Sequence, residues 1–196
     1  TVMIIGSLLA ILPFILLVIA SFTDNQTALV NGYSFTPEKW SLEAYQYIAS
    51  EWATIGRAYL MTILVTVIGT ALSLVITSTF AFAVSNDKLP GHKILMFLCI
   101  FTMLFNGGLV ASYYVYSNIF HIKNTIWALI VPTFLMSPFN VVLVKNYFSN
   151  SISPSILEAA RMDGAGVFAV FTKIVMPLSV PIMATVGLMT AIGYWN

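Results

Sequence analysis

The chain has 196 residues, of which 59% are hydrophobic and only 8% are charged, and its formal net charge at pH 7 is +1. An ordinary soluble domain carries roughly 25% charged residues, and one as apolar as this chain would expose large apolar patches and aggregate. The composition therefore excludes a soluble globular domain and predicts an all-α integral membrane protein, a polytopic bundle of transmembrane helices in the lipid bilayer. No basic cluster suggests a phosphate or lipid-headgroup partner, and we expect no nucleic-acid partner.

Five runs without Asp, Glu, Lys or Arg each reach the ~20 residues that a transmembrane helix needs. They cover residues 1–23, 58–86, 94–122, 124–144 and 174–196. The spans predicted within them are residues 2–22, 58–84, a third span that begins with residues 94 to about 105, 125 to about 144, and 177–196. Thr1 begins directly at an apolar run and Asn196 directly follows one, so we expect a single transmembrane domain over residues 1–196 that is truncated at both ends.

The first span contains Pro13, which predicts a kink. The loop that follows, residues 23–56, holds four acidic side chains against the single cation Lys39. It also holds aromatic residues that favour a position at the membrane interface: Trp40, Tyr45, Tyr47 and Trp52.

The second span is rich in small and hydroxylated residues: Thr62, Thr66, Gly69, Thr70, Ala71, Ser73, Thr77 and Ser78. Small residues let helices approach closely in lipid, and close packing is the favoured interpretation. The alternative is that these hydroxyls line a polar pathway. Cys99, the one cysteine, lies in the third run and is expected to be a packing residue.

Two later runs contain helix breakers. Asn106-Gly107-Gly108 interrupts the third run, and residues 112–123 beyond it are aromatic and polar. They are either an interfacial segment or an aromatic wall for a sugar, and the sequence does not separate the two. Pro132 and Pro138 imply unwound backbone inside the fourth run, where Asn140 is the most polar side chain.

Residues 153–177 form a charged island between apolar runs, too polar to cross a bilayer. Ser153 as N-cap and Pro154 at the first position predict a helix, with Ser155 and Glu158 as an alternative capping box. Gly164 predicts a turn with positive φ. A second helix follows, with an apolar stripe at helical spacing: Val167, Phe168, Phe171, Ile174 and Val175. Pro177 is expected to start the next element.

No constellation of residues supports catalysis. The two histidines, His92 and His121, fall on opposite sides of the membrane in this topology, and no carboxylate lies inside a predicted span. We therefore expect no enzymatic activity, no metal and no cofactor. There is no phosphate-binding P-loop motif either, so any energy for transport must come from another subunit.

The charged island resembles the EAA loop of ABC-importer permeases. Glu158-Ala159-Ala160, Gly164, Ile174 and Met176-Pro177 stand at that motif's spacing, with Met176 where Leu is usual. Asp163 before the Gly is similar to permeases that import sugars. Further segments resemble a branch that serves complex oligosaccharides: residues 13–22, 35–37, 41–45, 105–109, 124–125 and 195–196.

This resemblance implies a type I ABC importer permease with a core of six spans, five of them visible here. It implies a second permease subunit, two ATP-binding subunits and an extracytoplasmic solute-binding protein. The ATPase-coupling residues would be Glu158, Ala159, Ala160, Asp163, Gly164, Ile174 and Pro177. Contacts along the substrate pathway are guesses: Tyr113, Asn140, Tyr194 and Asn196.

Charge places the island in the cytoplasm, in agreement with the resemblance. Cytoplasmic loops carry an excess of Lys and Arg. The side of the membrane that holds the island has five basic residues, Lys88, Lys93, Lys145, Arg161 and Lys173, and the other side has three, Lys39, Arg57 and Lys123. The multi-pass chain is thus expected in the cell membrane, importing a sugar or oligosaccharide. The alternatives are a permease for another solute, such as a polyol, phosphosugar or peptide, and a non-transport membrane scaffold subunit.

Overall fold

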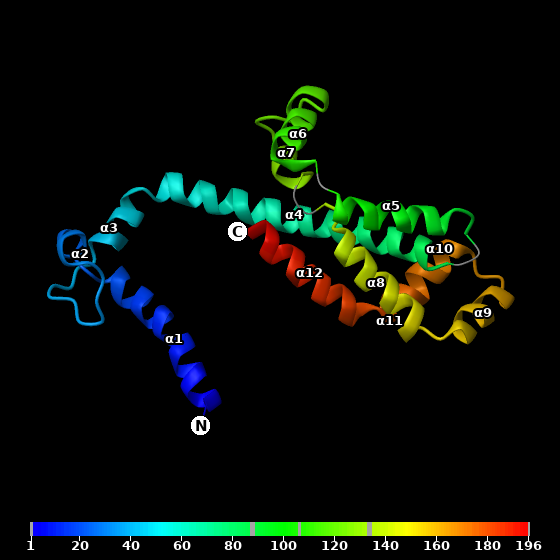
Figure 1. Cartoon of the computed structure of the whole chain (residues 1–196), viewed down its shortest axis with the longest axis horizontal. Helices are drawn as coiled ribbons and strands as arrows, with labels where there is room; N and C mark the ends of the chain where they lie inside the picture. Colours follow the sequence, from blue (N-terminus) through cyan, green and yellow to red (C-terminus); the bar gives the residue numbers. More distant parts are fainter. Residues whose placement is uncertain (1, 87–88, 106, 133–134, 196) are drawn as a thin grey trace. The chain divides into compact units, whose positions relative to one another are not determined.

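The computed structural model describes residues 2–86, 89–105, 107–132 and 135–195. Within these ranges the chain is helical and forms no strand beyond one isolated bridge between Thr23 and Trp40 (Figure 1). The predicted all-α class is confirmed. The chain divides into two compact units, residues 1–60 and 61–196, and each is described by itself.

The first unit holds α1 (Val2–Ser21), α2 (Asn25–Asn31), α3 (Glu43–Ser50) and the start of α4 (Trp52–Ser85). The N-terminus of α2 is capped by Asp24, whose carboxylate accepts hydrogen bonds from the Thr27 N–H at 3.2 Å and its hydroxyl at 3.1 Å. The Thr27 N–H is the main cause that holds the pKa of Asp24 below its usual value. Lys39 lies 3.8 Å from the same carboxyl group. These contacts close the loop onto the end of α1.

The second unit contains the rest of α4 and all later elements. These are α5 (His92–Leu104), α6 (Gly108–Tyr114), η1 (Val115–Ile119), α7 (Trp127–Ile130), α8 (Pro138–Ser151), α9 (Pro154–Met162), α10 (Val167–Val170), η2 (Phe171–Val175), α11 (Met176–Leu178) and α12 (Val180–Trp195). The elements η1 and η2 are π-helical turns.

Among the described residues, α4 is the one helix long and apolar enough to cross a membrane. Two further pairs of helices are long and apolar enough to cross a membrane only if each pair is taken as one bent span. The bend is 118° between α5 and α6–η1, and 79° between residues 167–178 and α12. Counting both pairs gives up to three spans. The first predicted span corresponds to the 20-residue helix α1, whose part Leu9–Ser21 is apolar. By length and composition alone, the five predicted spans are therefore not all single membrane-length helices.

The break in the helix that Pro132 and Pro138 predict inside the fourth run is confirmed. The fourth run contains the short α7 and then α8, which begins at Pro138 because proline fits the first turn of a helix and not its interior. The third run breaks at Gly107-Gly108, as predicted, and Gly108 has a φ of 78°. The last span begins at Val180, because the bend follows Leu178 and not Pro177.

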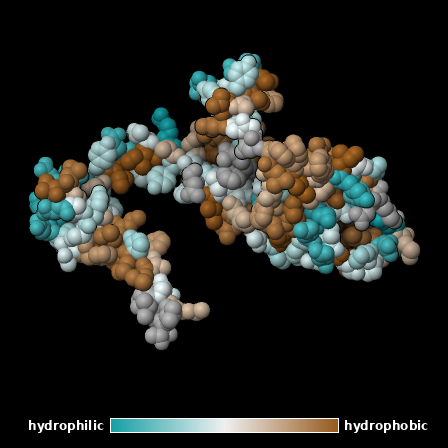
Figure 2. Space-filling model, in the orientation of Figure 1, coloured by the Kyte–Doolittle hydropathy of each residue, from teal (hydrophilic) through white to brown (hydrophobic). Residues whose placement is uncertain are grey.

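The largest apolar core joins α4, α5, α8, α9, η2 and α12. Phe82 of α4 is half-buried and packs against this core, with its ring centroid 5.0 Å from that of Phe171 and 6.5 Å from that of Phe148. Cys99 is buried in the same cluster, which confirms its packing role. The outer side of α5 is apolar and exposed, with Phe97 at 64%, and Figure 2 shows hydrophobic residues over this part of the molecule. Such a surface suits lipid.

The small residues of α4 pack against α12. A Cβ atom added to Gly69 would lie 2.6 Å from Cζ of Tyr194, so only glycine fits beneath that ring. Ser73 and Thr77 are fully buried on the same helix, and their hydroxyls have no hydrogen-bond partner within the described part of the chain. This burial favours the packing interpretation of the second span.

We predict that Gly69→Ala destabilises the protein by about 1–3 kcal/mol, because the Tyr194 ring is held by its own hydrogen bond and must move. Gly187→Ala is the matched control: its added Cβ would meet only the flexible end of Leu74, at 3.3 Å. The measurement is thermal unfolding of purified protein in mild detergent. Adding Tyr194→Leu should remove most of the Gly69→Ala penalty, and equal penalties for the two glycines would contradict the packing assignment.

Candidate functional site

The EAA-like segment begins with α9. Ser153 occupies the N-cap position and Pro154 the first turn, as predicted. The Ser153 hydroxyl does not cap the helix, however: its Oγ lies 2.7 Å from Oγ of Ser155. Because Ser155 lies inside the helix, the alternative capping box from Ser155 to Glu158 is wrong.

The turn after α9 is a Schellman motif centred on Gly164. Gly164 has a φ of 79°, as predicted, and its N–H donates to the Arg161 carbonyl at 3.1 Å. The Ala165 N–H donates to the Ala160 carbonyl at 3.0 Å. These two bonds satisfy carbonyls that the end of the helix would otherwise leave open. The turn therefore has a defined geometry that requires glycine at one position.

The predicted coupling residues divide between the core and the surface. Ala160 is buried in the apolar core, and Ile174 packs partly against it. The others are exposed: Glu158, Ala159, Asp163, Gly164 and Pro177. The segment is thus anchored on one side and presents its acidic residues on the other.

The predicted apolar stripe is partly wrong. Phe171 and Val175 are buried and Ile174 is half-buried, but Val167 is 70% and Phe168 is 77% exposed. The reason is η2, whose π-helical turn changes the phase of the side chains, so that Val170 faces the core instead. With Met162, which is 88% exposed, Val167 and Phe168 give the turn three exposed apolar side chains, an exposure that the sequence analysis did not predict.

A groove of about 260 Å³ lies between α9 and the ends of α4 and α8. Phe82, Phe148 and Leu157 give this groove an apolar lining. The charged residues Glu158 and Arg161 also border it. Neither of these charged side chains forms an ion pair within the described residues. The segment therefore combines a rigid turn with an exposed acid, an exposed base and exposed apolar side chains.

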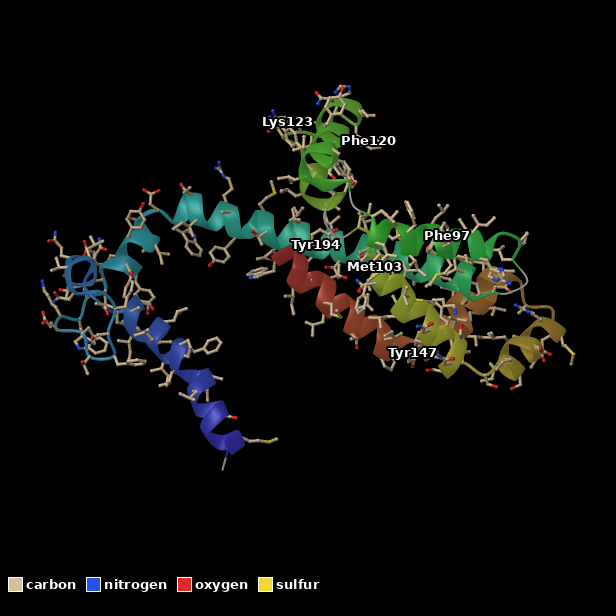
Figure 3. The ribbon with its side chains drawn as sticks, viewed as in Figure 1. Phe97, Met103, Phe120, Lys123, Tyr147 and Tyr194 are labelled. Carbon is tan, nitrogen blue, oxygen red and sulfur yellow. The ribbon has the colours of Figure 1, made fainter. Side chains whose placement is uncertain are left out.

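The guessed pathway residues lie in different environments. Tyr113 is exposed and borders a cavity of about 1000 Å³. Tyr194, labelled in Figure 3, is buried and borders another cavity of about 350 Å³. Asn140 is buried and donates to the Thr190 hydroxyl at 3.3 Å. Asn196 lies outside the described residues. The role of all four in a substrate pathway stays a prediction.

The helical arrangement and the EAA-like segment agree with comparisons to known proteins. Residues 72–196, more than half of the chain, match the family described as "Binding-protein-dependent transport system inner membrane component". The chain belongs to this family of ABC transporter permeases. An inner membrane component of a transport system lies in the cell membrane.

Two relatives come from Bacillus subtilis strain 168. The polygalacturonan/rhamnogalacturonan transport system permease protein YtcP is 40% identical over 97% of this chain and 65% of its own length. The protein LplC is 35% identical over 96% of this chain and 62% of its own length. The chain thus spans less than two thirds of either relative.

A solved structure has the same fold. It is a bacterial ABC transporter involved in the import of the acidic polysaccharide alginate, and its matching chain is 31% identical with a TM-score of 0.86. The match covers 100% of this chain and 68% of that one. The fold is therefore that of an ABC importer permease.

We predict that Gly164→Ala lowers stability by roughly 1–2 kcal/mol, because a side chain at positive φ is strained whatever space surrounds it. Gly166→Ala is the matched control. Its position is equally open but has a φ of −67°, which alanine adopts freely. Thermal unfolding of the two variants in detergent measures the difference. Equal melting temperatures would mean that the turn does not have the left-handed conformation.

Proposed function

We propose that this chain is a permease subunit of an ABC importer that passes a sugar or oligosaccharide across the cytoplasmic membrane. The observation that carries the proposal is the exposed, rigid turn at Gly164 in a chain of this family. The named relatives support a saccharide, because YtcP is named for polygalacturonan and rhamnogalacturonan and the solved transporter for alginate.

The proposed assembly contains a second permease subunit, two ATP-binding subunits and an extracytoplasmic solute-binding protein. Residues 153–177 face the cytoplasm in this arrangement and loop 23–56 faces outward. ATP hydrolysis takes place on the partner chains, and this chain has no enzymatic role. The family's description as binding-protein-dependent supports the solute-binding protein in this list.

Coupling would run through the turn into the core. The three exposed apolar side chains, Met162, Val167 and Phe168, would enter a cleft on the ATPase, with Glu158 pairing at its edge. Movement of the ATPase pair would then displace α9 and η2 together. Because Phe171 of η2 packs on Phe82, that displacement reaches α4 directly. The spans would rock, and the sugar site would open alternately to each side.

We predict that Gly164→Asp abolishes transport and lowers co-purification of the ATPase at least about tenfold, because the turn loses its shape and gains a charge. Gly166→Asp adds the same charge two residues away without the φ strain and serves as the control. The measurement is affinity purification of the full-length protein from mild detergent, with quantitative mass spectrometry of its partners.

Glu158→Ala tests the edge contact in the same experiment and should reduce ATPase recovery less than Gly164→Asp. The proposal fails if a folded wild type brings down no ATPase subunit. The coupling role fails separately if Gly164→Asp supports normal transport and normal ATPase recovery.

A further inference from the structure

The 1000 Å³ cavity is bordered by α6, η1, the loop before α7 and the start of α8. Its volume lies at the upper end of the usual range for small-ligand pockets, about 300–1000 Å³, and leaves room for an oligosaccharide. Figure 3 shows Lys123 and Phe120 on the projection made by these elements.

The lining has the composition of a carbohydrate site. Tyr113 and Tyr116 provide aromatic faces, and the Tyr116 ring stacks with that of Phe120 at a centroid distance of 6.0 Å. Hydroxyls of Ser112 and Ser117 also border the space, as does the amide of Asn124. Aromatic faces pack on the C–H faces of sugar rings, and hydroxyl and amide groups exchange hydrogen bonds with sugar hydroxyls.

Lys123 is the one charged residue that borders this cavity among the described residues. It forms no ion pair there, and the sequence contains no Asp or Glu between Asp87 and Glu158. The α5–α8 region thus presents an ammonium group without any carboxylate of its own to neutralise it. An anionic group on a bound sugar would be attracted to this position.

The loop that carries Lys123 has a defined conformation. His121 and Asn124, which flank Lys123 in the sequence, both have positive φ, 52° and 61°. The Ile122 N–H donates to the Tyr116 carbonyl at 3.2 Å, and the Thr125 hydroxyl donates to the Ile122 carbonyl at 2.6 Å. These bonds hold the backbone of residues 122–125 against η1, so Lys123 extends from a fixed point at the cavity.

We infer that this cavity binds an acidic oligosaccharide, a short chain of uronate sugars, with the Lys123 ammonium paired to a sugar carboxylate. The tyrosine rings pack on the sugar faces, and Ser112, Ser117 and Asn124 bind the hydroxyls. This inference rests on the proposed function, because it names the substrate class of the same importer and one residue that selects it.

The test is binding of trigalacturonate and of its methyl ester to the full-length permease with its co-purified partners in nanodiscs, without the solute-binding protein. Saturation-transfer NMR measures both affinities. We expect the acid to bind more tightly than the ester, and Lys123→Gln to weaken acid binding at least about tenfold without changing ester binding. Lys123→Arg should retain the preference. Added salt should weaken binding of the acid alone.

Lys93→Gln is the matched control, because Lys93 is an exposed lysine of α5 that does not border the cavity. Equal binding of acid and ester, no binding of either, or an unchanged affinity in Lys123→Gln overturns the inference. ATPase recovery and ATP hydrolysis stimulated by a neutral oligosaccharide are measured on the same samples. If these persist, the importer function stands while the uronate site fails; if no ATPase is recovered, the proposed function fails as well.

Discussion

Packing of the Phe82 ring against Phe171 and Phe148 is the contact on which the second unit depends. It brings together segments that lie far apart in the sequence: the end of α4, the end of α8 and the π-helical turn η2. The polar segment 153–177 would otherwise be a surface loop, free to move without consequence for the helices. Because one side of it is buried in this core, a force on the exposed turn is transmitted to three helices.

The end of α4 and its middle have different chemistry around them. Near Phe82 the surroundings are apolar, with a polar turn outside. Near Gly69 the helix meets Tyr194, whose hydroxyl donates to the Ile130 carbonyl at 2.8 Å. Beyond that contact lies the projection that carries Tyr113 and Lys123. This division fits the proposed function, in which the end of α4 near Phe82 transmits force and the region beyond Tyr194 recognises a polar solute.

Local chemistry accounts for what the sequence predicted well. Proline at a helix start and glycine at positive φ depend on single residues, so the start of α9 and the Gly164 turn could be read directly. The exposure of Val167 and Phe168 and the burial of Val170 could not be predicted, because they depend on a π-helical turn that leaves no mark in residue spacing. The break in the fourth span could be predicted, because its two prolines disfavour a helix interior, but the short length of α7 could not. The role of Lys123 depends on the loop conformation, which no spacing rule contains.

The unpaired hydroxyls of Ser73 and Thr77 have a mechanical consequence. Directional bonds give two helices a preferred register, and the described seam between α4 and α12 has none from these side chains. Two side-chain hydrogen bonds hold α12 elsewhere, from the Tyr194 hydroxyl to the Ile130 carbonyl and from the Asn140 amide to the Thr190 hydroxyl. α12 is therefore tied to residues 130–140 by directional bonds, whereas the Ser73 and Thr77 hydroxyls add no directional bond that would oppose sliding of α4 against its neighbours.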